Sequence, residues 1–411
     1  MIDYEDALAR MLGTASTLPV ERVDAANAIG RVLAAPLASA EALPPFDNSA
    51  MDGFALRCAG EVIHAGTVID VHGLRAAGDG KARADDGAWE IMTGARMPDG
   101  LDSIVPVEQV ETLDDDGGVP RIRVTADVTP GQHLRRAGED LQAGAVLAEA
   151  GTLVDPALRM LCAAVGIAEL PLRRRPRVAL INTGRELVDD PRRALGAGEI
   201  RNSNGPFLAA RLAAAGADVV ACRTVGDDVD AFLEALAVAG DVDVVVSTGA
   251  VSMGRFDFVP EALARLGATT LFHKTRIRPG KPILAATLPG GALFFGLPGN
   301  PSSTAVGLRF FVEPVLRRML GMPDERVLEL PLLAPYAKRA PLRMHLKARV
   351  VLDAGARACV EILAGQESFR IRPLLEANAW AVVPADVDTL PAGARVRVVS
   401  RGHLEPLGLY A

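Results

Sequence analysis

Three carboxylates in this sequence lie in loops where they could bind a divalent cation. Glu186 lies in "NTGREL", Asp227 in "GDDVD" and Asp257 in "STGAVSMGRFDF", and each loop follows a segment typical of a β-strand. Carboxylates repel phosphate, so three of them near one anionic ligand indicate Mg²⁺ bridging them to that ligand. Taken singly, Asp227 and Asp257 could each cap a helix, and Glu186 could be a solvated side chain.

A basic segment could supply the matching anion site. In "FHKTRIRPGKP" the residues Lys274, Arg276 and Arg278 alternate, so an extended chain would present all three on one face. Lys281 follows the Pro-Gly turn. In an acidic protein this is a marked positive patch, although an edge strand protected by charge against aggregation is the structural alternative.

The segment "LPGNPSS" is a second candidate for anion binding. Gly299 allows close backbone approach, and Asn300 followed by Pro301 is a good helix start whose free N–H groups favour anions. For this loop alone, an ordinary capped helix is the simpler interpretation. No complete Walker loop, G-x-G-x-x-G fingerprint, nucleophile elbow or kinase signature occurs in the chain.

Near the N-terminus, "PPFDNSAMDGFAL" places Asp52 directly before Gly53 and an apolar run. Local sequence alone favours an Asp-Gly turn leading into a strand. Whether the carboxylate of Asp52 has a chemical role cannot be decided from this motif by itself.

A doubly wound sheet is expected to position most of these loops. From Arg177 onward, strand-like runs such as "RVALI", "DVVACRTV" and "DVDVVVSTG" alternate with helical runs such as "PFLAARLAAAG" and "VDAFLEALAVAG". This alternation predicts an α/β domain with a mostly parallel sheet covered on both faces. Ligands of such sheets bind beyond the carboxyl ends of the strands, which is where the acidic loops and "LPGNPSS" fall.

The rest of the chain divides into smaller regions. Short alternating runs between Ala55 and about Val128 predict a β-rich domain, and "DPALRMLCAAVG" predicts a helix capped by Asp155 with Pro156 in its first turn. After Arg326 only short strands are expected, as in a small β-barrel or sandwich. The predicted domains are a linker domain (1–44 and 127–172), a β-rich domain (45–126), a doubly wound domain (173–325) and a C-terminal β-barrel (326–411).

Composition narrows the classes of function. The 411 residues are 49% hydrophobic and 23% charged, which is typical of a folded multidomain protein. A net charge of −7 argues against nucleic acid as the main partner. Four scattered cysteines and six histidines without ligand spacing predict neither a zinc site nor a disulfide scaffold, and fit a reducing cytoplasm. No apolar run is long enough to span a bilayer.

Seven motifs then occur in a characteristic order: "PPFDNSAMDGFAL", "IMTGARMPDGLDSIVPVE", "RRAGEDLQAG", "TGREL", "VSMGRFDF", "RPGKP" and "GLPGNPSS". Together they resemble the MoeA family, the molybdopterin molybdenumtransferases that include the E domain of gephyrin. The resemblance covers nearly the whole chain. It implies an elongated homodimer in which the doubly wound domain of one subunit faces the β-rich domain of the other across a cleft.

The resemblance also implies an activity and a site. Similar proteins take adenylated molybdopterin and molybdate, with Mg²⁺, and release molybdenum cofactor and AMP. The expected catalytic residues are Asp52, Thr93, Asp140 and Glu186, and the expected metal ligands are Glu186, Asp227 and Asp257. The expected substrate- and anion-binding residues are Thr183, Ser247, Gly249, Ser252, Lys274, Arg278, Lys281, Pro298, Gly299, Asn300 and Pro301.

In this interpretation Asp52 is delivered across the dimer interface, so that the turn fixes the direction of its carboxylate. Asp52 would position substrate or relay a proton, while Lys274 and Arg278 hold molybdate beside the dithiolene sulfurs. A molybdopterin adenylyltransferase and molybdoenzyme acceptors are the expected partner proteins, with no nucleic acid and no membrane. Molybdate and tungstate both stay open as the metal source.

Three residues depart from the family pattern. Arg185 stands where relatives usually carry Asp, Ala250 replaces a usual Gly, and Arg255 stands where an acid is common. The two arginines shift the local charge toward binding anions, and all three departures leave Glu186 and Asp257 in place. The alternatives are a non-catalytic molybdopterin-binding scaffold of the same fold, a molybdopterin adenylyltransferase and a CinA-like nucleotide hydrolase.

Overall fold

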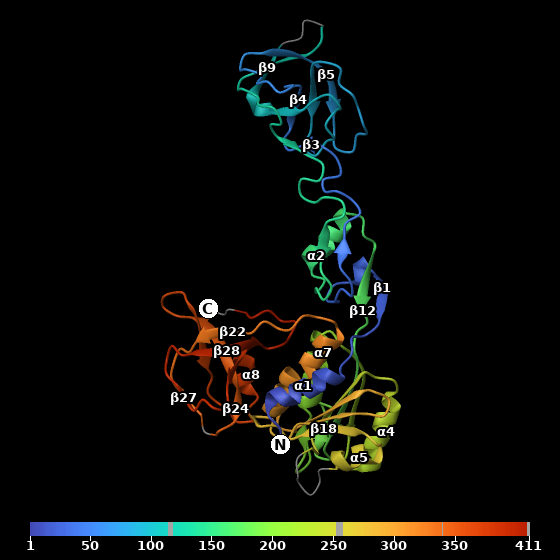
Figure 1. Cartoon of the computed structure of the whole chain (residues 1–411), viewed down its shortest axis with the longest axis vertical. Helices are drawn as coiled ribbons and strands as arrows, with labels where there is room; N and C mark the ends of the chain where they lie inside the picture. The colour runs from blue at the N-terminus through green and yellow to red at the C-terminus, as the bar shows by residue number, and fades with distance from the viewer. Residues whose placement is uncertain (114–117, 252–257, 339, 409–411) are drawn as a thin grey trace.

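The computed structural model describes residues 1–113, 118–251, 258–338 and 340–408. Figure 1 shows an elongated molecule in which a small β-domain is separated from a larger body by a narrow connecting region. Within the described residues, no helix combines the length and the apolar character needed to cross a membrane.

The distal β-domain contains a six-stranded sheet in the order β7-β4-β6-β5-β9-β8. Side chains such as Phe54, Leu56 and Val105 fill its core. These strands confirm the short alternating runs predicted from sequence. They are β4 (Gly53–Leu56), β5 (Val68–Arg75), β6 (Ala88–Ile91), β7 (Ser103–Pro106), β8 (Val110–Leu113) and β9 (Arg121–Val124), with the short 3-10 helix η2 (Val107–Gln109).

The connecting region is built from segments on both sides of the distal domain in sequence. The predicted helix is confirmed as α2 (Pro156–Ala164), and the Asp155 side chain accepts a hydrogen bond from the Leu158 N–H at 2.8 Å. Three antiparallel pairs, β1 with β12, β2 with β11 and β3 with β10, hold the outgoing and returning segments together. Their bounds are β1 (Val20–Asp24), η1 (Ala25–Asn27), β2 (Leu37–Ala38), β3 (Asn48–Ser49), β10 (Leu134–Arg135), β11 (Val146–Ala148) and β12 (Glu169–Arg173).

The body contains the predicted doubly wound sheet. Its order is β16-β13-β17-β21-β20-β18; the first four strands are parallel, and β20 runs antiparallel to both of its neighbours, β21 and β18. The buried run at β13 reads Val-Ala-Leu-Ile because both faces of the sheet are covered. The strands are β13 (Arg177–Thr183), β16 (Asp218–Val225), β17 (Val244–Thr248), β18 (Thr269–His273), β20 (Leu284–Thr287) and β21 (Leu293–Leu297), with the short pair β14 (Leu187–Val188) and β15 (Ile200–Arg201).

Helices cover both faces of this sheet. One core contains residues of α3, α6 and α7, and the other contains residues of α4 and α5. The helix expected to start at Asn300 and Pro301 is present, and a π-helical segment, η3, separates its two α-helical parts. The bounds are α3 (Asn204–Ala214), α4 (Val229–Ala239), α5 (Val259–Arg265), α6 (Pro301–Gly307), η3 (Leu308–Val312) and α7 (Glu313–Met319).

Helix α1 (Tyr4–Thr14) also packs in the body, although the sequence analysis placed residues 1–44 with the linker domain. Ala7 and Met11 are fully buried in the core shared with α3, α6 and α7. The Tyr4 hydroxyl donates a hydrogen bond to the Phe310 carbonyl at 3.1 Å. The apolar face of α1 therefore packs against the helices and sheet of the doubly wound domain.

The C-terminal domain is a curled sheet in the order β19-β24-β26-β28-β22, with β25 paired to β24. A bridge between Leu332 and Val360 joins the two ends of this sheet, from β22 to β25. A one-turn helix, α8 (Arg372–Glu376), corrects the expectation that no helix follows Arg326. The strands are β19 (Ile277–Arg278), β22 (Leu328–Pro331), β23 (Tyr336–Ala337), β24 (Arg343–Leu352), β25 (Ala358–Ile362), β26 (Ala379–Val383), β27 (Thr389–Leu390) and β28 (Arg395–Ser400).

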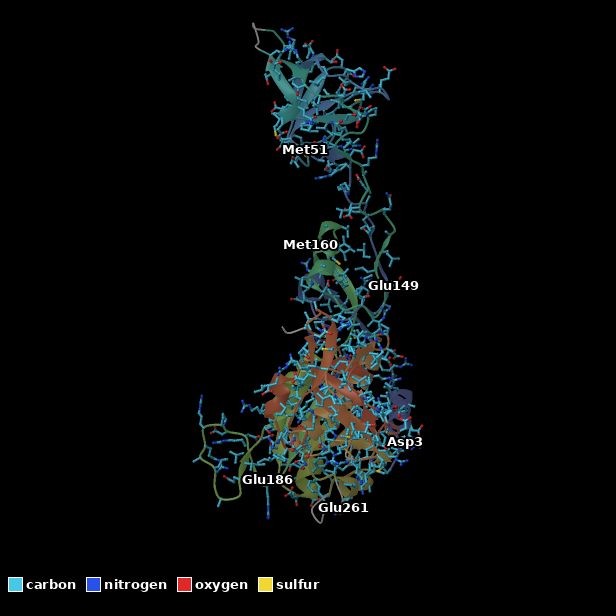
Figure 2. All side chains as sticks on the ribbon, turned by 90° about the vertical axis from the view of Figure 1, so that its left-hand side faces the viewer. Asp3, Met51, Glu149, Met160, Glu186 and Glu261 are labelled. Atoms are coloured by element: carbon cyan, nitrogen blue, oxygen red, sulfur yellow. The ribbon has the colours of Figure 1, made fainter. Side chains whose placement is uncertain are left out.

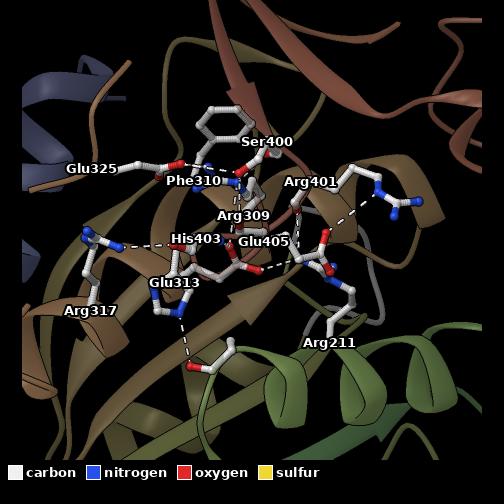
Figure 3. Close-up of polar contacts among 12 residues, drawn as sticks. Arg211, Arg309, Phe310, Glu313, Arg317, Glu325, Ser400, Arg401, His403 and Glu405 are labelled. Atoms are coloured by element: carbon white, nitrogen blue, oxygen red, sulfur yellow. Dashed lines mark hydrogen bonds and ion pairs between the residues drawn. The ribbon is translucent and has the colours of Figure 1, made fainter. Parts of the chain in front are cut away.

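A buried network of charges joins the αβα layers to the C-terminal domain (Figure 3). Glu313 is fully buried and accepts hydrogen bonds from Arg211 at 3.1 Å and from the His403 N–H at 2.9 Å. Burial raises the pKa of Glu313, against the opposing effect of Arg309 and Arg211. Arg211 also pairs with Glu405. This network is called the interdomain junction below.

Candidate active site

The distal domain presents Asp52 and Thr93 as a pair. One carboxylate oxygen of Asp52 accepts hydrogen bonds from the Thr93 N–H at 2.7 Å and from the Thr93 hydroxyl at 3.0 Å. Both side chains are exposed. The two donors from Thr93 hold the pKa of the Asp52 carboxyl below its usual value, so Asp52 is an oriented carboxylate anion at neutral pH.

The close packing of strand β4 against its neighbour requires the glycine that follows Asp52. Gly53 opens strand β4 rather than forming the interior of a turn, which corrects the simple Asp-Gly turn expected from local sequence. A Cβ at this position would lie 2.0 Å from the Val105 carbonyl oxygen of the neighbouring strand β7. The glycine therefore allows two strands to approach closely, and the strand fixes where Asp52 projects.

Asp140 lies on the returning segment, where the chain leaves the distal domain. Its N–H donates to the Leu43 carbonyl at 3.0 Å, and its side chain is exposed. Asp140 is thus placed beside the outgoing residues that lead to the Asp52 motif. The structure brings Asp52 and Thr93 into direct contact, whereas Asp140 lies in the connection, against Leu43.

The carboxyl ends of β13 and β17 form a tightly packed polar edge. The Thr183 hydroxyl donates to the Thr248 carbonyl at 3.0 Å, and Gly249 follows with φ +88°. A Cβ on Gly249 would lie 2.6 Å from the Thr183 hydroxyl oxygen, so only glycine fits. Ser247 is fully buried, and its hydroxyl has no hydrogen-bond partner among the described residues.

Sequence reasoning missed Asn182, whose fully buried side chain belongs to the same edge. Its carbonyl oxygen accepts from the Thr248 hydroxyl at 3.0 Å, while its amide nitrogen has no partner within the described part of the chain. The sequence does carry a signal for Asn182, because it is a polar side chain at the end of an otherwise apolar strand. Unpaired buried donors are rare in folded proteins and call for an explanation.

The acidic residues of this edge are only partly brought together. Glu186 folds back on its own loop, since a Cβ on Gly184 would lie 2.8 Å from both of its carboxylate oxygens. Asp227 is exposed and does not cap α4, because Asp228 accepts the capping hydrogen bond from the Ala231 N–H at 2.8 Å. The alternative that Asp227 caps a helix is therefore wrong, and its exposed carboxylate is accessible to a ligand.

Residues 252–257 lie outside the described part of the chain, and with them Ser252, Arg255 and Asp257. Among the described residues, no three His, Cys, Asp or Glu side chains gather closely enough to hold a metal ion. Glu186 and Asp227 offer carboxylate oxygens only, which is the donor type that Mg²⁺ prefers. Their donor chemistry suits Mg²⁺, but the described residues alone do not form a metal site.

The "LPGNPSS" segment follows the last parallel strand of the sheet. Pro298 is buried, and its carbonyl accepts from the Thr304 hydroxyl at 2.6 Å. Gly299 and Asn300 are exposed, and the Asn300 side chain makes no capping hydrogen bond to helix α6, which begins at Pro301. The Thr304 hydroxyl therefore anchors the backbone of this loop, while Gly299 and Asn300 face solvent.

A second asparagine supports this loop. The Asn204 side chain, at the start of α3, donates to the Gly299 carbonyl at 2.7 Å. An added Cβ on Gly299 would lie 3.9 Å from the Cα of Gly249, so the two glycine loops are neighbours. Loops after β17 and β21 therefore form one glycine-lined edge.

The basic segment is less regular than its sequence indicates. Lys274 has a positive φ of 71°, so the extended alternation begins only after it, with Thr275 buried and Arg276 exposed. Arg276 lies 3.6 Å from Asp3. The expectation that three basic side chains share one extended face is wrong for Lys274, because the chain turns there to pair with Ile2.

Arg278 and Lys281, the other two basic residues, are both exposed. Arg278 lies in β19, which pairs with β24 of the C-terminal domain. The basic segment thus connects the sheet edge of the αβα layers with the C-terminal domain, and its free cations are available to an anion.

Within one chain the two halves of the expected site are far apart. In Figure 2, Met51 lies at the lower end of the distal domain, whereas Glu186 lies near the opposite end of the molecule. The Asp52–Thr93 pair and the acidic loop of Glu186 cannot act on the same bound molecule in this conformation of a single chain.

Comparison with known proteins agrees with this division into parts. The chain matches the MoeA N-terminal region (domain I and II) over residues 2–166, a probable molybdopterin binding domain over residues 179–318 and the MoeA C-terminal region (domain IV) over residues 329–400. It is 39% identical to the molybdopterin molybdenumtransferase of Synechococcus elongatus, covering 97% of this chain and 100% of that protein. The chain belongs to the MoeA family.

Other MoeA relatives extend the match. The chain is 36% identical to molybdopterin molybdenumtransferase 2 of Mycobacterium tuberculosis, covering 96% of this chain and 98% of that protein. A crystal structure of the MoeA protein of molybdopterin biosynthesis from Pyrococcus horikoshii superposes with a TM-score of 0.80 at 26% identity, covering 97% of this chain and 100% of that one. The fold is therefore of the MoeA type, with a molybdopterin-binding αβα domain.

Proposed function

We propose that this MoeA chain inserts molybdate into adenylated molybdopterin with Mg²⁺, releasing molybdenum cofactor and AMP. Its place in molybdenum cofactor biosynthesis, as a molybdopterin molybdenumtransferase, follows from the family. The observation that carries the assignment is the match along 97% of the chain to a transferase of that name at 39% identity. The finer steps below rest on the geometry of the sheet edge.

The sheet edge is suited to an anionic, phosphate-bearing ligand. The loops at Gly249 and Gly299 lack side chains that would block approach to the backbone. Arg278 and Lys281 supply exposed positive charge in a chain that is acidic overall. Glu186 and Asp227 would hold Mg²⁺, which would neutralise phosphate oxygens and make the bond to AMP easier to break.

Asp52 is proposed to act on a substrate bound by a second copy of the chain. Its carboxylate is fixed by two hydrogen bonds from Thr93 and stays ionised at neutral pH. The separation between Met51 and Glu186 in Figure 2 makes a site completed by a partner the simplest arrangement. In a two-fold dimer the same contact occurs twice, which gives two sites. Asp52 would then orient the substrate or accept a proton there.

The primary test is AMP release from adenylated molybdopterin by the purified protein, with Mg²⁺, in the presence and absence of molybdate. Release that depends on molybdate is expected. Asp52→Ala should lower the rate by about 100-fold or more, as expected for loss of a positioned acid–base group. AMP formed from ATP, or nucleotide cleavage without molybdate, would instead support an adenylyltransferase or a nucleotide hydrolase.

The shared site has its own test. We expect Asp52→Ala and Glu186→Ala each to be inactive, and their co-expressed mixture to regain activity. Each mixed dimer would contain one intact site, so random pairing should restore about a quarter of the wild-type rate. A mixture as inactive as either single variant would contradict a site built from two chains. A molybdopterin adenylyltransferase as substrate donor and molybdoenzymes as product acceptors are the proposed partner proteins.

A further inference from the structure

Lys347, in strand β24 of the C-terminal domain, is an unusually buried lysine. The residue is 1% exposed. Its ammonium group donates to the Ser302 hydroxyl at 3.1 Å, the Arg370 carbonyl at 3.3 Å and the Glu367 carbonyl at 3.4 Å. A buried charge is costly unless it is well hydrogen-bonded, so this position is held by a specific set of partners.

Two of these partners belong to one segment of the C-terminal domain, residues 366–370. The Gln366 side chain accepts from the Lys347 N–H at 3.0 Å and donates to the Lys347 carbonyl at 2.8 Å. The segment is therefore attached to Lys347 through both its backbone and its side chain. It forms a platform, residues 366–370, whose carbonyl groups converge on the ammonium group.

The third partner belongs to the αβα layers. Ser302 is the second residue of helix α6 and follows the "LPGN" turn directly. Its N–H donates to the Ser368 carbonyl at 2.9 Å, and its hydroxyl donates to the Arg370 carbonyl at 3.0 Å. The first turn of α6 is thus docked on the platform, with Lys347 at the centre of the contact.

We propose that Lys347 is a positioning residue that holds the Gly299–Pro301 loop in its binding geometry through Ser302 and the platform. The inference rests on the proposed function, because it takes this loop to contact the anionic part of the substrate. The C-terminal domain thereby supports the loop at the sheet edge. Its contacts fix the position of backbone groups that belong to the doubly wound domain.

The charge of Lys347 adds to this role. Burial lowers the pKa of Lys347 to about 8, with Glu367 opposing the shift and Arg370 adding to it. On the α6 side the group that faces the ammonium is the neutral Ser302 hydroxyl. As pH rises through this value, one donor and the positive charge are lost, so the loop should become less firmly held.

The test compares Lys347→Met with Lys338→Met in the full-length protein. Lys338 is a matched control, since its side chain is also 1% exposed and donates to the carbonyls of Pro384 and Ala385 in the same domain, without contacting α6. We expect Lys347→Met to weaken binding of adenylated molybdopterin about 5- to 20-fold with a smaller change in kcat, as for loss of a charged hydrogen bond. Lys338→Met should leave this affinity unchanged.

Two further measurements exclude a merely structural effect. Lys347→Arg should recover part of the affinity, and Ser302→Ala should weaken binding without adding to the effect of Lys347→Met, because both break one contact. Equal affinity losses in both Met variants, or fully additive losses for Lys347 and Ser302, would overturn the proposal.

A readout without substrate separates this proposal from the assigned activity. Backbone amides of residues 299, 300 and 302–305 should exchange with deuterium faster in Lys347→Met than in Lys338→Met. Faster exchange together with no binding of adenylated molybdopterin by the wild type would overturn the proposed function and keep the positioning role of Lys347. Unchanged exchange would overturn the positioning role itself.

Discussion

At the interdomain junction (Figure 3), Glu313 is fully buried and its oxygens accept hydrogen bonds from Arg211 and from the His403 N–H. At the carboxyl edge of the sheet, Ser247 is just as buried, but its hydroxyl has no partner in the described residues. The junction pairs its buried carboxylate with arginines and a backbone N–H, although Nδ1 of His403 also lacks a partner among the described residues. The sheet edge leaves polar groups and charges available, which favours a ligand at some expense of stability.

The largest effect is expected from breaking the junction. Glu313→Ala should lower the free energy of unfolding by about 3–5 kcal/mol, because it leaves Arg211 and Arg309 buried without this carboxylate. Denaturant titration measures the loss. Glu405→Ala is the control: it removes a more exposed partner of the same Arg211 and should cost less than about 1 kcal/mol. Equal losses would contradict the importance of burial.

Acid should weaken the junction before it affects Asp52. His403 is buried and neutral, with Nε2 bonded to the Ala215 carbonyl at 3.0 Å, and burial lowers its pKa to about 3. The unfolded chain binds this proton near pH 6.5, so stability is complete above that pH and falls as the pH drops toward 3. The loss from His403 should be roughly 2 kcal/mol between pH 6.5 and 5.

Urea titrations at pH 7 and pH 5 measure this loss. His403→Gln cannot take up the proton, so its stability should depend less on pH than that of the wild type. The buried His345, whose pKa is also lowered, remains in both proteins and cancels in the difference. An identical pH dependence in the two proteins would show that His403 is not the group responsible.

Removing a polar group at the sheet edge should raise stability, in contrast to the loss expected at the junction. Ser247→Ala removes a buried hydroxyl without a partner and should raise the free energy of unfolding by about 1 kcal/mol. Affinity for adenylated molybdopterin should nevertheless fall several-fold. Thr248→Val, which removes the hydroxyl bonded to Asn182, should instead lower stability by about 1 kcal/mol. Greater stability with unchanged affinity for Ser247→Ala would place this serine outside the site.

The smallest effect concerns Ala250, which has a φ of +49° at the same edge. A side chain is unfavourable in this left-handed conformation, which glycine adopts without strain. Ala250→Gly should raise the unfolding free energy by about 0.5 kcal/mol, after the greater freedom of glycine in the unfolded chain is counted. Ala356→Gly, with a φ of +57°, should give a similar gain far from the ligand loops. A loss of stability in Ala250→Gly alone would show that its methyl group packs usefully.

The strands and helices that carry the sheet edge could be predicted because their signals are local. Apolar runs such as Arg177–Thr183 and the Asp155–Pro156 helix start depend on neighbouring residues only. The choice between Asp227 and Asp228 as the helix cap could not be made, because it depends on the backbone angles of one short loop. Local sequence therefore predicts which loops follow the strands, but it does not predict which side chain of a loop makes a given hydrogen bond.

The remaining features depend on contacts between distant residues. The chain departs from the extended pattern at Lys274 because Ile2, near the N-terminus, pairs with Thr275. The contact between Lys347 and Ser302 joins two domains, and although Ser302 lies in "LPGNPSS", nothing in that motif or around Lys347 shows that the two residues meet. Periodicity reports which side of an element is buried, but it does not report which element covers it.

Helix α1 has a consequence for the order of events during synthesis. It is translated before the other helices described in the structure, yet the Tyr4 hydroxyl binds a carbonyl 306 residues later in the chain. The nascent chain therefore carries the apolar face of α1 without its final partners while the connecting region and the distal domain are made. Helix α1 waits for partners that are made much later, and during this interval its exposed apolar face makes the new chain prone to aggregation.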